Sequence, residues 1–429
     1  MKSQLLTVQF KRGQRSYIGR DGALRDASPE GPRRRAAHEF TRIRRRVFTF
    51  LPLILSCFLT PRLFAADTLS LSPQKQPDLS FRNELQHAID RGLAWLQTNQ
   101  DSNGWWSSPQ DPGVTGLVVM SFQGNPTIKP GQPRPEWLDR AYAYILASAQ
   151  PDGGIYRSNL YTYNTSICMM ALLAADKPEY EPVLLKARRY LVGQQNQGNP
   201  GDPLDGGIGY GEHYGHPDMG NTLFALEALH YSKQLIQDKS PAEPDLDWNA
   251  AIHFLENCQN LPSHNPASWV ADDPKNLGGF VYYPSNSNAG TFTNTLTGKV
   301  ALRSYGSVSY DGLLSYIYAD LKPDDPRVAA VFKWLQDNYT IDENPAMGQA
   351  GVYYYYHTMA KALTVYNISE LQLADGRKVD WRRELALKLM NLQQSDGSWV
   401  NTVARWREKE PVLVTAYSVL SLEIIYRGI

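Results

Sequence analysis

The segment GYGEHYGHPDMGNTLFALEAL gathers side chains that could bind a metal ion or transfer a proton. His213 and His216 stand three residues apart beside two carboxylates, and imidazole with carboxylate suits metals of borderline hardness. The spacing is not the helical i, i+4 histidine pair of a zinc protease. Alternatively, Asp218 or Asn221 caps a helix that begins near Thr222, since both residue types favour that position. The segment contributes Asp218 as a candidate catalytic residue and Asn221 and His216 as candidate ligand-binding residues, and we assign no metal ligand.

A second group of candidates lies further along the chain, where Asp311 and His357 each stand near the start of a strongly apolar segment. Capping is common for aspartate but explains a histidine poorly. A carboxyl group and an imidazole could transfer protons, or they could form a buried pair whose polar atoms are merely satisfied. Tyr305 and Tyr310 closely precede Asp311, and we expect both to edge the same site.

Four consecutive tyrosines, at positions 353 to 356, directly precede His357. Aromatic faces attract cations, so these rings could stabilise a positively charged ligand or intermediate. They could equally fill a turn between two helices. Alternate side chains of an extended run point in opposite directions, so at most two of the four can face one site. We assign Tyr356 to the site.

An internal repeat organises these residues. Six amphipathic segments each lead into a turn rich in glycine and aromatic residues, and a second, more apolar segment follows each turn. A helix that is apolar on all sides is buried on all sides. Six such pairs are satisfied best by a closed ring with charged helices outside and apolar helices inside. The prediction is an all-α protein, an α/α toroid of about six helix pairs, in which polar residues such as Asn164, Ser309 and Thr415 cap the inner helices.

The repeats resemble the QW repeats of squalene-hopene and oxidosqualene cyclases, because a glutamine precedes a Gly-aromatic turn, as in LQTNQDSNGWW and LQQSDGSWV. The helix pairs are also similar to those of the β subunits of protein prenyltransferases, which form the same toroid. The resemblance covers roughly residues 79–426. It implies that the glutamines bond backbone groups at helix ends and that the aromatic residues pack between repeats.

The cyclase resemblance implies a catalytic acid that this chain lacks. Triterpene cyclases protonate an alkene with the middle aspartate of an Asp-x-Asp-Asp-Thr segment. The matching segment here retains Asp218, but Gly220 stands at the middle acid and Asn221 at the last. Glycine cannot donate a proton, so the cyclase mechanism does not transfer to this segment.

The prenyltransferase resemblance implies a zinc site that is also incomplete. The β subunits hold Zn²⁺ with an aspartate, a cysteine and a histidine, and the metal activates a thiol. Asp311 and His357 match two ligands, but Leu313 replaces the cysteine. Asp311 and His357 remain candidate catalytic residues, and we expect no cofactor.

With both motifs broken, the sequence favours a non-catalytic binding or scaffold protein with an apolar cavity, for an apolar small molecule or a protein partner. The alternative hypothesis is an enzyme of diverged chemistry on an isoprenoid or polysaccharide substrate. For a polysaccharide, Asp311 and Asp218 would be the carboxylate pair that glycoside hydrolysis needs.

The first part of the chain differs in charge from the rest. The whole sequence has 43 basic and 43 acidic residues, but residues 1–66 carry a charge of +10. Four arginines within residues 42 to 46 precede a short apolar run and a small-residue end at Ala65 and Ala66, the order of a secretory signal. We expect residues 1–66 to be a disordered basic leader with a signal peptide, and residues 67–429 to be a single exported toroid, periplasmic or secreted. Its acidic charge argues against nucleic-acid binding, and no stable membrane span is expected after signal removal.

Overall fold

The computed structural model describes residues 78–129, 132–198, 201–211, 216–237 and 243–429. The predicted leader, residues 1–66, lies outside these ranges. The described chain is mostly helical, as predicted, and none of its helices is long and apolar enough to cross a membrane. The main helices are α2 (Leu79–Thr98), α3 (Pro112–Gly124), α4 (Glu136–Leu146), α5 (Tyr161–Ala175), α6 (Glu181–Gly193), α7 (Met219–Tyr231), α9 (Trp248–Cys258), α10 (Gly306–Tyr318), α11 (Pro326–Asp337), α12 (Val352–Val365), α13 (Trp381–Leu392) and α14 (Pro411–Gly428).

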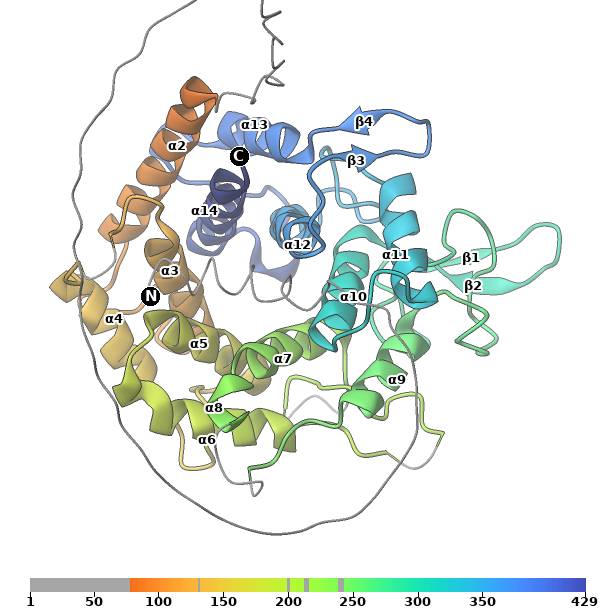
Figure 1. Ribbon diagram of the computed structural model, residues 1–429, viewed down its shortest axis with the longest axis horizontal. Helices are drawn as coiled ribbons and strands as arrows, with labels where there is room; N and C mark the ends of the chain where they lie inside the picture. Colours follow the sequence, from red (N-terminus) through yellow and green to blue (C-terminus); the bar gives the residue numbers. More distant parts are fainter. Residues whose placement is uncertain (1–77, 130–131, 199–200, 212–215, 238–242) are drawn as a thin grey trace, which may run out of the picture. The chain divides into compact units, whose positions relative to one another are not determined.

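Six helices form the inner ring that the apolar pattern predicted: α3, α5, α7, α10, α12 and α14. Each contacts the next along the chain, and α14 contacts α3, which closes the ring (Figure 1). Within α10 every residue except Ile317 is buried, as expected for a helix apolar on all sides. The outer helices pack on this ring, α4 against α3, α6 against α5, α11 against α10 and α13 against α14. The α/α toroid is confirmed.

The repeated glutamines tie neighbouring repeats together, as the resemblance implied. The Gln259 side-chain amide donates to the carbonyl oxygens of Gly278 in its own turn and Arg327 in α11, at 2.9 and 3.0 Å. Gln393 closes the ring in the same way, because it donates to the carbonyl oxygen of Ala88 in α2 at 2.9 Å. The glutamine amides thus join each turn to the backbone of a neighbouring outer helix.

Replacing Gln259 should be costly. We expect Q259A to lower the free energy of unfolding by about 2–4 kcal/mol, because two buried carbonyls and the Tyr316 hydroxyl, which donates to Gln259 Oε1 at 2.9 Å, lose a partner. Urea unfolding followed by circular dichroism measures the change. Q237A removes an exposed glutamine and should change the free energy by less than about 0.5 kcal/mol. Equal losses in the two variants would contradict the prediction.

The glycine of the repeated turn has a steric role. Gly397 has a φ of +98°, and a Cβ there would lie 2.6 Å from the carbonyl oxygen of Arg91 in α2. Gly104 has a φ of +95°, and its Cβ would lie 2.5 Å from the carbonyl oxygen of Arg140 in α4. Only glycine combines this conformation with so close an approach. The turns therefore set the distance between outer helices.

The polar residues near the inner-helix starts anchor these turns, and the prediction that they cap the helices is wrong. Ser309 Oγ accepts from the backbone N–H of Phe280, and Thr415 Oγ1 from that of Trp399, both at 3.0 Å. Asn164 Oδ1 accepts from the N–H of Gly113 in α3 at 2.8 Å. The helices begin three or four residues before these positions, at Tyr161, Gly306 and Pro411, so each of these polar residues lies inside its helix and not at the cap.

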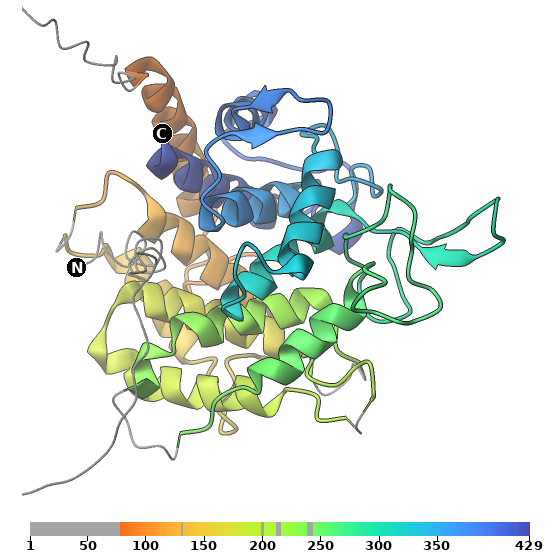
Figure 2. The same ribbon diagram turned by 45° about the vertical axis from the view of Figure 1, so that its right-hand side comes forward.

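The fifth repeat departs most from its predicted form. Helix α12 begins at Val352, so tyrosines 353 to 356 lie in its first turns and not in an extended run. Successive side chains of a helix point about 100° apart, so the four rings spread around it. Two loops contain hairpins. Strands β1 (Thr291–Thr293) and β2 (Val300–Leu302) pair between α9 and α10, and β3 (Leu371–Gln372) and β4 (Lys378–Val379) pair between α12 and α13. Hairpin β1–β2 projects from the helices (Figure 2).

Candidate active site

Aromatic side chains from four inner helices meet inside the ring, and we call Tyr163, Phe224, Tyr354, His357 and Tyr417 the axial cluster. The hydroxyl groups of Tyr163 in α5 and Tyr417 in α14 lie 3.3 Å apart. The ring centroids of Phe224 in α7 and Tyr354 in α12 lie 6.1 Å apart. Neither pair of helices is adjacent in the ring, so both contacts cross its interior. Tyr163, Phe224 and Tyr354 are only half-buried, so part of each residue remains accessible to solvent.

Asp311 lies beside this cluster on α10. It is 3% exposed, and its Oδ1 accepts a hydrogen bond from the Tyr354 hydroxyl at 3.0 Å. Burial raises the pKa of Asp311 well above its usual value, although the Tyr354 hydrogen bond acts in the opposite direction. Burial therefore favours the protonated carboxylic acid over the carboxylate, and Oδ2 is the oxygen that can carry the proton.

Glu408 fixes the start of α12 and was not among the sequence candidates. It is 1% exposed, and its Oε1 accepts from the backbone N–H of Tyr354 at 2.8 Å. Its Oε2 accepts from the Asn401 amide at 2.6 Å. Burial raises the pKa of Glu408, while these hydrogen bonds lower it. A carboxylate is favourable at a helix N-terminus. Because Glu408 belongs to no repeat motif, the sequence carried no signal for this role.

Asp218 caps α7, as one of the two interpretations of its segment predicted. It is fully buried, its Oδ1 accepts from the backbone N–H of Asn221 at 3.0 Å and its Oδ2 from the Asn221 amide at 2.7 Å. Burial raises the pKa of Asp218 to about 6 despite these bonds and the nearby His216. His216 stacks on Tyr283 with ring centroids 4.2 Å apart, and its Nδ1 lies 3.1 Å from the carbonyl oxygen of Pro217.

The stability of the protein should depend on pH through Asp218. Its folded pKa of about 6 exceeds the usual 3.8, so the folded state binds this proton more tightly and loses stability as pH rises toward 6. Asparagine caps as well as aspartate but does not titrate. From about pH 5 to about pH 8 the wild type should lose about 1–2 kcal/mol of unfolding free energy relative to D218N. Urea titrations at both pH values measure this, and a pH-independent difference would contradict it.

The two aspartates influence each other, because the charge of Asp218 contributes to the raised pKa of Asp311. Two carboxyl groups whose pKa values are pushed apart divide into an acid and a base. Burial favours the protonated form of Asp311, while Asp218, with a pKa of about 6, is largely ionised at neutral pH. Burial raises the pKa of Tyr305, with smaller effects of the charges of Asp311 and Asp218, and its hydroxyl accepts from the Asn288 amide at 3.2 Å.

His357 stacks on Tyr417 with ring centroids 5.4 Å apart. It is 5% exposed, and its Nδ1 has no hydrogen-bond partner among the described residues. Burial, with a smaller effect of Lys361, holds the pKa of His357 well below its usual value, so the imidazole is neutral. A neutral imidazole with a free nitrogen can accept a proton.

Tyr310 and Tyr356, which we predicted to bind ligand, point elsewhere. The Tyr356 hydroxyl donates to the carbonyl oxygen of Ile341 at 2.7 Å, in the loop between α11 and α12. Tyr310 packs against Tyr355 with ring centroids 5.6 Å apart, and its hydroxyl has no partner among the described residues. Helical geometry instead directs Tyr354 toward Asp311, which the assumption of an extended run had obscured.

A second polar layer crosses the ring one or two helical turns beyond the axial cluster. Glu227 of α7 and Lys361 of α12 form an ion pair at 2.8 Å, and the Tyr318 hydroxyl of α10 lies 3.3 Å from Glu227. Both charged groups are largely buried. The ion pair therefore bounds the interior on the side of the helix C-termini.

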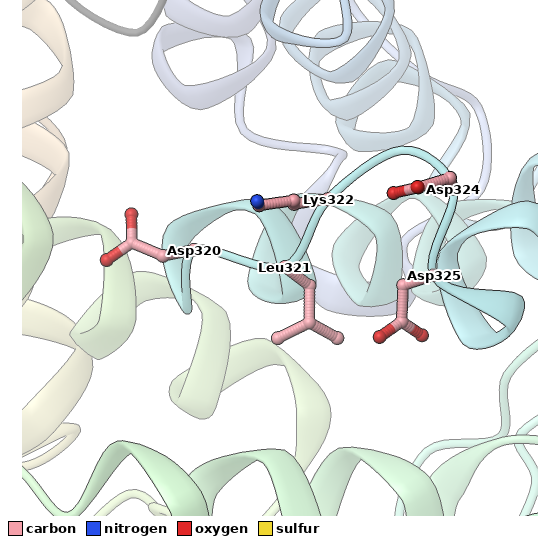
Figure 3. A pocket seen from close by; sticks show the side chains of 5 residues that line it. All are labelled: Asp320, Leu321, Lys322, Asp324 and Asp325. Atoms are coloured by element: carbon pink, nitrogen blue, oxygen red, sulfur yellow. The ribbon is translucent and has the colours of Figure 1, made fainter. Parts of the chain in front are cut away.

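Two surface hollows lie away from these residues. One, of about 430 Å³, is formed by the turn from α10 to α11 and is lined by Asp320, Leu321, Lys322, Asp324 and Asp325 (Figure 3). The other, of about 420 Å³, lies beside α11 and includes Trp334 and Arg303. The described residues contain no group of three or more histidine, cysteine, aspartate or glutamate side chains that could hold a metal. Glu212 and His213, part of the predicted metal alternative, lie outside those residues.

Comparison with known proteins adds a partial relative. A stretch of 81 residues, 18% of this chain, is 38% identical to drimenyl diphosphate synthase from Streptomyces showdoensis. The chain is a terpene cyclase-like α/α toroid. The match spans only 14% of that enzyme's length. No protein-family profile matches the toroid.

Solved structures similar to this toroid include the type II terpene cyclase MstE from Scytonema, in complex with geranylgeranyl dihydroxybenzoate. It is 13% identical, with a TM-score of 0.48 over 82% of this chain and 99% of that one. The GH76 α-mannanase BT2949 from Bacteroides thetaiotaomicron is 11% identical, with a TM-score of 0.49 over 80% and 96%. Likenesses this distant do not support a function.

The prediction of a non-catalytic binding or scaffold protein is wrong. The partial relative is an enzyme whose name states a terpenoid product, and the match favours the alternative hypothesis of an enzyme that acts on an isoprenoid. Two broken motifs had suggested that catalysis was lost. They show only that Gly220 replaces the middle acid of one motif and that Leu313 replaces the cysteine of the other.

Proposed function

We propose that this protein is an isoprenoid cyclase that starts its reaction by protonating an alkene. The observation that carries the proposal is Asp311, a buried carboxyl group inside the ring whose protonated form burial favours, hydrogen-bonded by Tyr354 and bordered by aromatic rings. An acid enclosed by hydrocarbon-like surfaces suits an alkene better than a sugar chain. The partial match to drimenyl diphosphate synthase supports the same class of substrate.

In the proposed reaction the Oδ2 proton of Asp311 moves to an alkene carbon, and the electrons of the double bond form the new C–H bond. The Tyr354 hydrogen bond to Oδ1 stabilises the carboxylate that remains. The carbocation then adds to further double bonds of the same molecule. Rings such as Phe224 and Tyr417 stabilise it through their faces, by about 2 kcal/mol or more for each desolvated contact.

A base must remove a proton from the last carbocation. We assign this role to His357, because its ring is neutral, stacks on Tyr417 and has a free Nδ1. Transfer of that proton back to the Asp311 carboxylate, directly or through solvent, restores the enzyme. Asp218, ionised at neutral pH, would favour positive charge nearby.

Removal of the base should change the products more than the rate. We expect H357A to consume substrate at a rate within about tenfold of wild type, while the product mixture shifts toward isomers or alcohols formed by other proton or water transfers. Gas chromatography with mass spectrometry resolves the mixture. The matched control is H253A, which alters an exposed histidine of α9 and should leave the products unchanged. A slower reaction with an unchanged product mixture would assign His357 a structural role only.

The proposed function is tested by incubating the purified full chain with squalene, geranylgeraniol and farnesyl diphosphate in D₂O. A cyclase that protonates an alkene yields cyclic isomers in which one deuterium comes from solvent, because the Asp311 proton exchanges with water. Mass spectrometry counts that deuterium. Absence of cyclic product from all three substrates, or cyclic product without deuterium, would refute the proposal. We further propose that the protein acts after export, as its predicted leader implies.

A further inference from the structure

The N-terminal ends of the inner helices, whose N–H groups attract anions, are occupied by the chain's own side chains. Glu408 accepts from the start of α12 and Asp218 from the start of α7, at 2.8 and 3.0 Å. Asn164 accepts from the first turn of α3 at 2.8 Å, and Asn344 from the first turn of α10 at 2.9 Å. In four of the six inner helices, an N–H group of the first turn thus donates to a side chain of the same protein, and two of these four side chains are carboxyl groups.

The cations near the axial cluster are already paired. Lys361, whose charge acts on His357, contacts both carboxylate oxygens of Glu227 at 2.8 and 2.9 Å. Arg407, whose charge acts on Tyr163, contacts Asp111 at 2.8 Å and Glu410 at 2.6 Å. Each cation is thus matched or outnumbered by carboxylates in its own ion pair, and little positive charge is left for a ligand.

The remaining charge around the cluster is acidic. Asp218 and Glu408 accept from the N-terminal ends of two inner helices, and Asp311 accepts from the Tyr354 hydroxyl of the axial cluster. Arg405, whose charge acts on Tyr305, is exposed and donates to Asn288 Oδ1 at 2.8 Å. A phosphorylated head group inside the ring would therefore meet carboxyl groups, while Lys361 and Arg407 are already paired. Repulsion between like charges is strong where water is largely excluded.

We infer that the substrate of this toroid is an isoprenoid with an uncharged head group, an alcohol or a hydrocarbon, and not a diphosphate ester. The inference rests on the proposed function for the reaction but concerns recognition alone. It separates this chain from its partial relative, whose name states a diphosphate product. The axial cluster would bind the hydrocarbon chain, and the acidic groups would reject the phosphorylated analogue.

Binding measurements test the inference without any turnover. Isothermal titration calorimetry on the full chain at about pH 7.5, with and without Mg²⁺, compares farnesol, farnesyl diphosphate and inorganic pyrophosphate. We expect the diphosphate ester to bind at least about tenfold more weakly than the alcohol, and pyrophosphate not to compete with the alcohol. D218N removes one negative charge and should reduce the ratio of the dissociation constants of the diphosphate ester and the alcohol about threefold or more. D324N, an exposed control, should leave that ratio unchanged.

Equal or tighter binding of the diphosphate ester, competition by pyrophosphate, or no binding of farnesol would each overturn the inference. The cyclisation assay reports separately on the proposed function. If farnesol binds selectively but no isoprenoid is cyclised, the reaction is refuted while the uncharged ligand class stands. If the diphosphate ester is the substrate that is cyclised, the reaction stands and the inference fails.

Discussion

D311N is expected to abolish cyclisation, lowering its rate by about a thousandfold or more, while the protein stays folded. A positioned general acid typically contributes a factor of about 10² to 10⁴, and no other protonated carboxyl group is assigned to the reaction. Asparagine has the size of aspartic acid, and its Oδ1 can still accept from the Tyr354 hydroxyl. Its amide cannot protonate an alkene. Rates of product formation with the substrate found active measure the loss.

Stability separates loss of the acid from loss of the fold. Burial of the ionisable group disfavours the charged form of Asp311, so D311N should melt at the wild-type temperature or above it. The matched control is D324N, the same change at an exposed position in the turn after α10 (Figure 3), and it should leave activity and melting unchanged. If folded D311N retained activity within about tenfold of wild type, Asp311 would not be the acid.

E408A is expected to lower stability and activity together. It leaves the backbone N–H of Tyr354 and the Asn401 amide without their acceptor in a buried site, which should cost about 3 kcal/mol or more. Because Tyr354 orients Asp311, a shift of this turn should also slow cyclisation by about 10- to 100-fold at temperatures where the variant is folded. Urea unfolding and turnover assays on the same preparation measure both effects.

The conservative variant E408Q distinguishes positioning from bulk packing. Glutamine retains one acceptor oxygen at the start of α12, so E408Q should recover at least half of the lost stability and most of the activity. E370A removes an exposed glutamate whose ion pair with Lys378 lies at the surface, and it should change stability by less than about 1 kcal/mol. Equal losses in E408A and E408Q, or activity unaffected in E408A, would contradict the positioning role.

The fold could be predicted because its causes are local and repeated. Helix pairs of unequal polarity, a glutamine before each turn and a glycine within it determine the ring, and Gln259, Gln393 and Gly397 act as the repeat implies. The helix starts were less certain. Ser309 and Thr415 lie three and four residues inside helices that begin at Gly306 and Pro411, and the apolar pattern did not reveal these starts.

The candidate site could be predicted from the sequence only in part. Asp311, His357 and Asp218 could be named from the sequence, because their residue types and repeat positions were visible in it. Tyr354 and Tyr356 could not be told apart, since the side of α12 that each occupies depends on where the helix begins, and Glu408, more than 50 residues away, sets that start. Contacts between residues so distant in the chain leave no local pattern.

The sequence by itself thus determined the ring, its repeat and the acids available to it. Only the tertiary structure distinguished the two candidate acids, Asp218 and Asp311. Asp218 caps α7 and Asp311 lies in the second turn of α10, and the difference between these two aspartates arises from their surroundings. Asp218 is stabilised as an anion by an N-cap hydrogen bond and Asn221, whereas Asp311 is buried beside aromatic rings with one tyrosine donor. Desolvation and hydrogen bonding, which depend on neighbours from other repeats, set the protonation state of each.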